Sequence, residues 1–365
     1  WLAPTMLRAT ARISALRGAT ARAAARRASS THRSPLAVTY IDSWIREHAA
    51  SFAPPVMNKL MHRDQLSIMF VGGPNEREDF HLEEGSEFFY QLRGSMQLPT
   101  VQAGQREDFH LEEGSEFFYQ LRGSMQLPTV QAGQRVVVTI REGEVYLLPS
   151  RIPHSPQRPE RGSIGLVIER QRYEHEPPDG LRYYTDFQTC EAVLWERYFH
   201  CQDLGKDLAP IAAAFHASEE RRTRAPSAPM RRAIGRPQLE QDVHTVVPPP
   251  FSLQAWLERR DNAAALDGGA SLDLFAGHPD REFRVRVVGG ASEQREQRWR
   301  HESWLMQLRG KARVRTAGGT VTLGEGACTV VPAEHVYSVE RPAGSRGLVV
   351  TNDPLGNRRA APGDS

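Results

Sequence analysis

Short apolar runs separated by glycine, proline and polar residues fill residues 57–174 and return after residue 251. Runs of this length and spacing are typical of β-strands joined by tight turns. The pattern predicts strands and hairpins over most of the chain. The clearest predicted strands are Ser67–Val71, Glu116–Leu121, Val136–Ile140, Val145–Leu148 and Ile164–Ile168.

The two strand-rich parts of the chain resemble each other. FYQLRG at residues 118–123 matches LMQLRG at 305–310, and GEVYLLP at 143–149 matches GACTVVP at 326–332. A chain of 365 residues is long enough for two compact units. We therefore expect a mainly β protein in which one barrel module occurs twice.

Composition shifts suggest where these modules begin and end. Residues 1–34 contain arginines but no acidic residue, and we expect a disordered or transit-like extension there. The first barrel is expected over 41–205, opening with a short helix at 41–51. A helix is expected over 190–217, and the Arg- and Pro-rich stretch 218–250 is expected to be a linker. We thus assign 206–250 to a helical segment and linker and 251–354 to the second barrel.

A segment of 29 residues occurs twice without a single change, at Arg77–Gln105 and again at Arg106–Gln134. Repeat architectures need three or more diverged units, so this pair is no solenoid. Only one copy can occupy a given position in the barrel. The second copy continues directly into the predicted strand Val136–Ile140, and we favour it slightly for that reason.

Charge and cysteine content narrow the classes of partner. The net charge of +2 gives no reason to expect a nucleic acid, and no apolar run approaches the ~18 residues of a membrane-spanning helix. The three cysteines are an odd number at wide spacings, which predicts neither a disulfide framework nor a Cys-based metal site. A reducing, cytoplasmic location is expected, or a mitochondrial one if residues 1–34 act as a transit peptide.

A possible metal site follows from one histidine–glutamate pair and one later histidine. His110 precedes Glu116 by six residues, and His154 follows the GEVYLLP strand. This order resembles the paired motifs of the cupin superfamily and predicts two cupin (jelly-roll) β-barrels, a bicupin. In the first copy, Arg77, His81 and Glu87 are equally good candidates by residue type.

Two imidazoles and one carboxylate form the facial arrangement typical of non-haem Fe(II), which leaves three coordination positions open. His110, Glu116 and His154 therefore predict Fe(2+) as the cofactor. The second half provides an internal control, because Gln297, Ser303 and Tyr337 align with those three residues. That combination is a poor iron site, so we expect the second barrel to bind no metal.

Longer motifs narrow the resemblance from the cupin superfamily to one family within it. NKLMH (58–62), MFVGGPN (69–75), DFHLEEGSEFFYQL, LLPSRIPHSPQR (147–158), GLVIER (165–170) and DGLRYY (179–184) occur in this order. Together they resemble the 3-hydroxyanthranilate 3,4-dioxygenases of the animal and fungal two-barrel type. The resemblance covers about residues 42–354 and is strongest over 54–204.

The resemblance implies an oxidoreductase that opens the ring of 3-hydroxyanthranilate with O2, giving 2-amino-3-carboxymuconate semialdehyde. Such a product leads to quinolinate and NAD in the kynurenine pathway. By resemblance, iron is bound by His110, Glu116 and His154, and Arg106 lies near the oxygen site. Arg158 is implied to bind the substrate carboxylate, with Glu169 contacting its polar groups and Glu169 or Glu116 accepting a proton.

Two other classes of function remain open. The duplication could displace the ligand strands and leave a catalytically inactive cupin used for binding or storage. Alternatively, the barrel could be another cupin enzyme, such as a metal-dependent isomerase, although Arg158 stands where many cupins have asparagine. The expected partners are the small-molecule substrate and O2, with no nucleic acid and no membrane, and we expect a monomer.

Overall fold

The computed structural model describes residues 35–52, 57–75, 77–84, 87–93, 96–97, 100–102, 115–120, 124–131, 134–172, 176–201, 204–279 and 282–352. Most elements are strands, as the apolar pattern predicted. The extension predicted at residues 1–34 lies outside the described residues, as do Arg106 and His110 of the second copy.

A seven-stranded sheet forms one wall of the N-terminal barrel. In spatial order it contains β15 (Phe251–Ser252), β11 (Glu144–Pro149), β8 (Ser115–Gln120), β5 (Glu87–Arg93), β12 (Ile164–Arg170), β3 (Leu66–Gly72) and β2 (Asn58–Arg63). Its side chains alternate between two environments. Leu147 and Ile168 face the C-terminal barrel, whereas Leu148 and Val167 face the interior of the N-terminal barrel.

Two smaller sheets complete this barrel. One contains β14 (Val193–Phe199), β13 (Asp179–Tyr184) and β4 (Asp79–Leu82), and the other contains β6 (Met96–Gln97), β10 (Gln134–Arg141), β7 (Thr100–Gln102) and β9 (Ser124–Gln131). Ile140 of β10 packs with Met69 and Leu148 of the large sheet, so a common apolar core joins the walls.

The C-terminal barrel repeats this plan with two sheets. The first has the order β1 (Thr39–Tyr40), β22 (Ala327–Val331), β19 (Ser303–Arg309), β24 (Arg346–Asn352), β17 (Phe283–Gly289) and β16 (Ser271–Asp273). The second has the order β18 (Ser292–Gln297), β23 (Tyr337–Arg341), β20 (Ala312–Thr316) and β21 (Gly319–Leu323). The mainly β, two-barrel fold expected from the sequence is confirmed.

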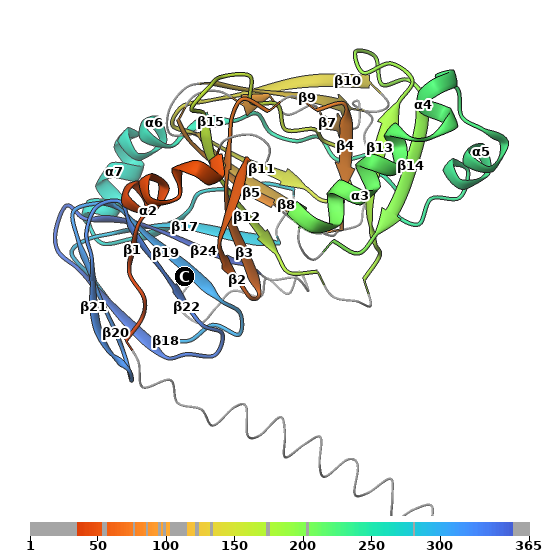
Figure 1. The fold of residues 1–365 in the computed structure, drawn as a ribbon. Helices are drawn as coiled ribbons and strands as arrows, with labels where there is room; N and C mark the ends of the chain where they lie inside the picture. The colour runs from red at the N-terminus through yellow and green to blue at the C-terminus, as the bar shows by residue number, and fades with distance from the viewer. Residues whose placement is uncertain are drawn as a thin grey trace, which may run out of the picture.

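The large sheets of the two barrels face each other, with the blue C-terminal strands at the lower left of Figure 1. Phe70 and Ile168 of the first barrel share one apolar cluster with Val285, Trp304 and Leu348 of the second. Two short strands also cross between the units. β1 pairs with β22, and β15 pairs with β11. The C-terminal barrel therefore contains a strand from the N-terminal part of the chain, β1. The N-terminal barrel contains a strand from the C-terminal part, β15.

Both copies of the duplicated segment contribute a strand to the large sheet. β5 of the first copy pairs antiparallel with β12, and β8 of the second copy pairs antiparallel with β11. Between them, β5 and β8 run parallel, with Phe88 opposite Phe117 and Tyr90 opposite Tyr119. Equivalent residues of the two copies therefore lie side by side, and the sheet is one strand wider than its C-terminal counterpart at this point.

The helices differ in part from the expectation. The short helix expected at 41–51 is confirmed as α2 (Ile41–Glu47) followed by the 3-10 turn η1 (Ala49–Phe52). The continuous helix expected over 190–217 is wrong in its first part, which forms β14, and the helix α3 spans Leu204–His216. Pairing with β13 along its whole length stabilises β14 as a strand, a non-local contact that local apolar spacing does not reveal.

The stretch expected to be a linker contains two helices, α4 (Glu219–Thr223) and α5 (Ala228–Ile234). Ser218 and Ser227 cap them by accepting hydrogen bonds from Arg221 and Met230. Farther along, Leu239 and Val247 are buried against the N-terminal barrel, so this stretch is not an independent spacer. The second strand-rich unit also begins with helices, α6 (Leu253–Glu258) and α7 (Arg260–Asp267).

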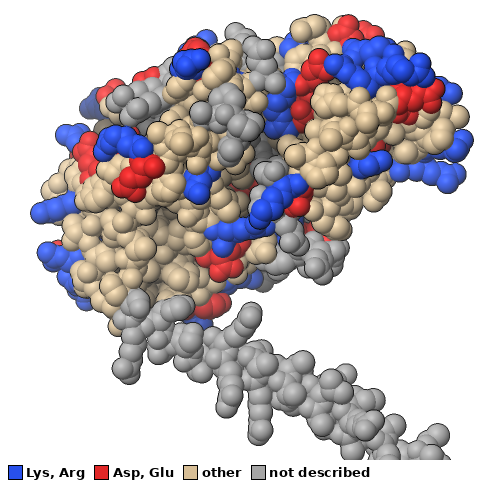
Figure 2. Space-filling model, in the orientation of Figure 1, with Lys and Arg blue, Asp and Glu red and all other residues tan. Residues whose placement is uncertain are grey.

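Lysine and arginine side chains are spread over the visible surface, with a concentration at the upper right in Figure 2, the position of α4 and α5 in Figure 1. The exposed arginines there are Arg222, Arg224, Arg231, Arg232 and Arg236. No helix among the described residues is long and apolar enough to cross a membrane. The three cysteines are buried and free of disulfide bonds.

Candidate metal centre

Two buried histidines lie side by side inside the N-terminal barrel. His81 is in β4, and His154 follows β11. Their backbones form a reciprocal bridge, with His81 N donating to His154 O at 2.8 Å and His154 N donating to His81 O at 3.0 Å. The ring centroids are 5.7 Å apart. One histidine from each cupin motif is therefore brought to the same point.

The ring of His154 is oriented by its own loop. Its Nδ1 lies 3.0 Å from the carbonyl oxygen of Ile152. Because a carbonyl only accepts hydrogen bonds, Nδ1 carries the proton, and Nε2 of the neutral ring carries the lone pair. A hydrogen bond of this kind is the usual way in which proteins fix the tautomer of a metal-binding histidine.

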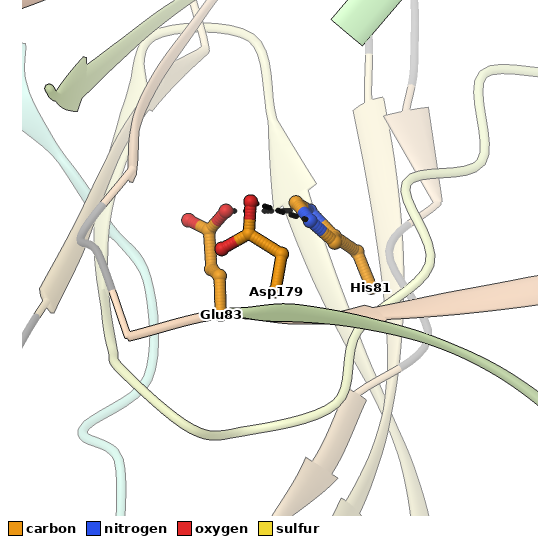
Figure 3. Close-up of side chains that lie close together, drawn as sticks. All are labelled: His81, Glu83 and Asp179. Atoms are coloured by element: carbon orange, nitrogen blue, oxygen red, sulfur yellow. Dashed lines mark ion pairs between the residues drawn. The ribbon is translucent and has the colours of Figure 1, made fainter. Parts of the chain in front are cut away.

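Two buried carboxylates accompany His81. Figure 3 shows the side chains of Glu83 and Asp179 directed toward its imidazole. Glu83 Oε2 lies 3.4 Å from His81 Nδ1, and Asp179 Oδ2 lies 3.9 Å from His81 Nε2. Potential ligand atoms of these three residues lie within 4.8 Å of one another. This buried group can hold a metal ion.

Arg172 connects the carboxylates. It forms ion pairs with Glu83, with Glu169 at 3.2 Å and with Asp179 at 2.8 Å. Three buried carboxylates thus share one guanidinium. Buried carboxylates are stabilised by paired cations or by a bound metal, so the cluster can accommodate a divalent metal.

Buried carboxylate oxygens without a hydrogen-bond donor also favour a metal in this cluster. Within the described part of the chain, Glu83 Oε1 and Asp179 Oδ2 are buried without a hydrogen-bond donor. Buried carboxylate oxygens normally accept hydrogen bonds or bind a metal. Burial also raises the pKa of the neighbouring Cys201 thiol.

The backbone places both candidate glutamates at one level of the barrel wall. Glu116 pairs with Leu148, and Glu87 pairs with both Leu148 and Glu169. The side chains of Glu87 and Glu116 lie outside the described part of the structure, so their place at the site stays a prediction.

The residues implied to bind substrate are buried in the same barrel. Glu169 of β12 is 3% exposed and belongs to the Arg172 cluster, and Arg158 is fully buried. The backbone of Arg158 pairs with Asn75, next to Arg77. Arg77 forms an ion pair with Asp79, and although burial opposes it, this contact lowers the pKa of Asp79.

The ligand from the second copy is not located by the structure. His110 and Arg106 lie outside the described residues, so their assignment to the site stays a prediction. His81 of the first copy, the alternative, is the histidine that lies beside His154. The natural connection from Asn75 into the first copy accounts for this, since Asn75 is anchored to Arg158 by two backbone hydrogen bonds.

The C-terminal barrel has the corresponding positions with other side chains. Gln297 pairs with Tyr337 in neighbouring strands, as His81 pairs with His154. Ser303 pairs with Val331 and Thr351 and forms a hydrogen bond with the Tyr337 side chain. Gln297 and Tyr337 thus stand in the C-terminal barrel as His81 and His154 do in the N-terminal barrel.

Sequence reasoning missed Glu83, Asp179 and Arg172. Glu83 and Asp179 lie within motifs that carried the family resemblance, but nothing local distinguished them from surface acids. The one available signal was the position of Arg172, which follows the apolar strand motif GLVIER by only two residues and could therefore lie close to the barrel interior. Glu169 and Asp179 are close to Arg172 in the sequence, whereas Glu83 comes from a distant segment that only the fold brings near it.

Comparison with known proteins accords with this geometry. A model of the 3-hydroxyanthranilic acid dioxygenase family matches residues 35–108 and again residues 102–216. A rat 3-hydroxyanthranilate 3,4-dioxygenase is 41% identical over 86% of this chain and 96% of its own length. The chain belongs to the 3-hydroxyanthranilic acid dioxygenase family. Its two overlapping matches divide at the duplication, so each copy lies in one of the matched segments.

Other family members give the same result. The mouse and human 3-hydroxyanthranilate 3,4-dioxygenases are 40% and 38% identical, each covering 86% of this chain and 96% of the relative. Among solved structures, a cupin 2 conserved barrel domain protein from Leptotrichia buccalis covers 87% of the chain with a TM-score of 0.42 and 8% identity. That likeness is too distant to add to the argument on the site.

Proposed function

We propose that the chain is an Fe(II)-dependent dioxygenase that opens the aromatic ring of 3-hydroxyanthranilate with O2. Both oxygen atoms enter the product, 2-amino-3-carboxymuconate semialdehyde, so the reaction needs no external reductant. The observation that supports this most is the pair His81–His154, buried in an acidic cluster of a chain from this family. The product would serve quinolinate and NAD formation in tryptophan breakdown.

For the metal, we propose His81, His154 and one glutamate of the duplicated segment, Glu87 or Glu116. The fixed tautomer of His154 and the buried carboxylates beside His81 both suit a divalent cation. Two histidines and one carboxylate are the set that non-haem Fe(II) prefers. Bound there, ferrous iron would supply the redox chemistry and the Lewis acidity that the reaction needs.

For the substrate, we propose that Arg158 binds the carboxylate. A guanidinium grips a carboxylate with two parallel hydrogen bonds, and complete burial of Arg158 makes this contact strong and fixes the ring in one orientation. The apolar cluster inside the barrel, which includes Leu148 and Val167, would help to exclude water from the ring. The arginine near the oxygen site would be Arg77. Arg106 is the equivalent residue in the second copy.

Glu169 is proposed to accept the proton of the substrate hydroxyl. Arg172 lies 3.2 Å from Glu169 Oε2 and favours its ionised form, which is the form that can act as a base. Glu83 and Asp179 hold the same guanidinium in place from other strands. Arg172 is therefore a positioning residue that acts through Glu169.

Anaerobic reconstitution with Fe(II), followed by addition of O2 and 3-hydroxyanthranilate, tests the proposal. A near-UV absorbance band of the ring-opened product is expected. Absence of iron uptake would instead support the inactive binding or storage module, and iron uptake without product would support another cupin chemistry.

Partners and location are proposed from the same family membership. We propose a monomer that acts on small molecules in the cytoplasm, without nucleic acid or membrane partners. Gel filtration would test the oligomeric state. Imaging of the chain with and without residues 1–34 would distinguish the cytoplasm from mitochondria.

A further inference from the structure

We propose that Glu282 of the C-terminal barrel is a positioning residue for the metal centre of the N-terminal barrel. It acts through Arg170, whose guanidinium connects Glu282 to the segment that carries Glu83 beside His81. The inference rests on the proposed metal site and assigns the C-terminal barrel a role in it.

Neighbouring residues of β12 face in opposite directions. Ile168 packs in the apolar cluster between the barrels, so Arg170, two residues later, lies on the same face of the strand. Glu169, between them, instead forms an ion pair with Arg172 inside the N-terminal barrel. One short strand therefore has the proposed site on one face and the C-terminal barrel on the other.

A buried ion pair joins the two barrels at Arg170. Its Nε pairs with Glu282 Oε1, and the two side chains are only 3% and 5% exposed. A second carboxylate, Glu176, lies 2.7 Å from Arg170 Nη2 but is 17% exposed. Although burial opposes it, the two carboxylates raise the pKa of Arg170. Without Glu282 the buried guanidinium would keep only the more exposed partner and would be drawn toward it.

The same guanidinium binds the backbone next to the metal centre. Arg170 Nη2 donates a hydrogen bond to the carbonyl oxygen of Glu84 at 3.3 Å. The preceding residue, Glu83, has its Oε2 3.4 Å from His81 Nδ1. On its other side, the carbonyl oxygen of Glu83 accepts a hydrogen bond from the backbone N–H of Arg151 at 2.9 Å. Residues 83–84 are thus fixed by the loop after β11 and by Arg170.

The shape of the guanidinium makes the coupling direct. Its donors lie in one rigid plane, so the contact of Nε with Glu282 sets the orientation in which Nη2 reaches Glu84. Partners outside the ligand shell orient the groups around a metal, and their loss typically costs about 10–100-fold in metal affinity or activity. Loss of Glu282 should therefore be felt at His81.

Glu302 provides a matched control, because it is a second buried carboxylate of the C-terminal barrel that binds the N-terminal one. Its Oε2 lies 3.0 Å from His62 Nε2 and accepts a hydrogen bond from the backbone N–H of Leu66 at 2.8 Å. Both partners belong to the hairpin of β2 and β3, which contributes no residue to the proposed metal centre. E302Q therefore weakens contacts between the barrels without touching residues 83–84.

The first test measures amide hydrogen exchange in the iron-free full chain by mass spectrometry. The peptide of residues 147–158 occurs once in the sequence and contains two amides that donate to the backbone carbonyls of Glu83 and His81. In E282Q these amides should exchange at least about 10-fold faster than in the wild type, because the segment they bind is released. In E302Q they should stay within about twofold of the wild type. Equal exchange in the two variants would overturn the inference.

The second test asks whether Glu282 acts through Arg170. E282Q and R170M should each weaken anaerobic Fe(II) binding at least about 10-fold. The double variant should bind no more weakly than R170M alone, since both changes break the same series of contacts. Additive losses would overturn the inference. If the wild type binds no iron, the proposed function fails instead, and exchange in the iron-free protein still decides the role of Glu282.

If E282Q does not fold, R170K replaces it in the exchange measurement. Lysine keeps the positive charge but lacks the rigid fork that binds Glu282 and Glu84 together. R170K should therefore also accelerate exchange in the peptide of residues 147–158 at least about 10-fold. Exchange as slow as in the wild type would overturn the inference.

Discussion

The two barrels of this chain share one architecture but differ in what fills the position of the metal. In the N-terminal barrel, His81 and His154 lie among Glu83, Asp179 and Arg172. In the C-terminal barrel the corresponding strands bring Gln297, Ser303 and Tyr337 together. Strand register is therefore preserved while the side-chain chemistry is not, so that fold and site are independent properties of the same module.

The barrels also differ in how they stabilise buried charge. Arg341 is 2% exposed in the C-terminal barrel, and burial lowers its pKa to about 10, with Tyr337 partly offsetting this. Its guanidinium donates a hydrogen bond to the neutral side chain of Gln294 at 3.1 Å. In the N-terminal barrel, by contrast, Arg172 is surrounded by carboxylates. The two barrels thus pair these buried arginines differently, one with carboxylates and the other with a neutral amide.

The largest effect is expected from H154A, because His154 is the proposed ligand that both copies share. Loss of an imidazole ligand should reduce kcat/KM at least about 1000-fold, equivalent to about 4 kcal/mol of transition-state stabilisation. Y337F at the matching position of the other barrel should change kcat/KM less than twofold. Steady-state kinetics and iron content measure both. If H154A still bound iron and were active, the proposed difference in metal binding between the two barrels would be wrong.

The next largest effect shows which copy of the duplicated segment supplies the histidine ligand. H81A should lose iron and activity to nearly the same extent as H154A, since His81 is the histidine bridged to His154. H110A should retain both. The same kinetics and iron assays apply to the two variants in parallel. The reverse result would show that the second copy supplies the histidine, as the sequence alone slightly favoured.

A smaller effect, on stability, is expected from R172M. Removal of the guanidinium leaves Glu83, Glu169 and Asp179 buried without their shared cation, which should cost about 3 kcal/mol in the free energy of unfolding of the iron-free protein. Chemical denaturation measures it. Arg295, in an exposed pair with Glu293, is the matched control, and R295M should leave the free energy of unfolding nearly unchanged. Equal costs for the two variants would show that the cluster is not an organised site.

The smallest effect is expected from removal of residues 106–134. Because the two copies are identical, deletion of either yields the same protein. A single strand should then pair with both β11 and β12, as β19 pairs with β22 and β24. The free energy of unfolding should change little, because the remaining copy can make the pairings with β11 and β12 that the two copies now divide. Loss of the fold would show that the wider sheet is a requirement of this chain.

Much of the fold was predictable because its strands are short and apolar, and their order repeats in two halves. The strands containing Val145 and Ile168 were expected within two residues of their observed limits. β14 was not, because Leu194 and Tyr198 are compatible with either a helix or a strand, and only pairing with β13 decides between them. Of the site, His154 and Glu169 were foreseen on local motifs, whereas Asp179 and Arg172 were not.

The sequence by itself determined the module, the family and the residue types at the site, because these depend on motifs within single strands and their turns. It could not decide between two identical segments, since identical residues carry identical local information. The tertiary structure placed His81 beside His154, put both duplicate strands into one sheet and surrounded Arg172 with three carboxylates. Those outcomes depend on contacts between segments far apart in the chain, where pairing and burial, rather than local preference, dominate the free energy.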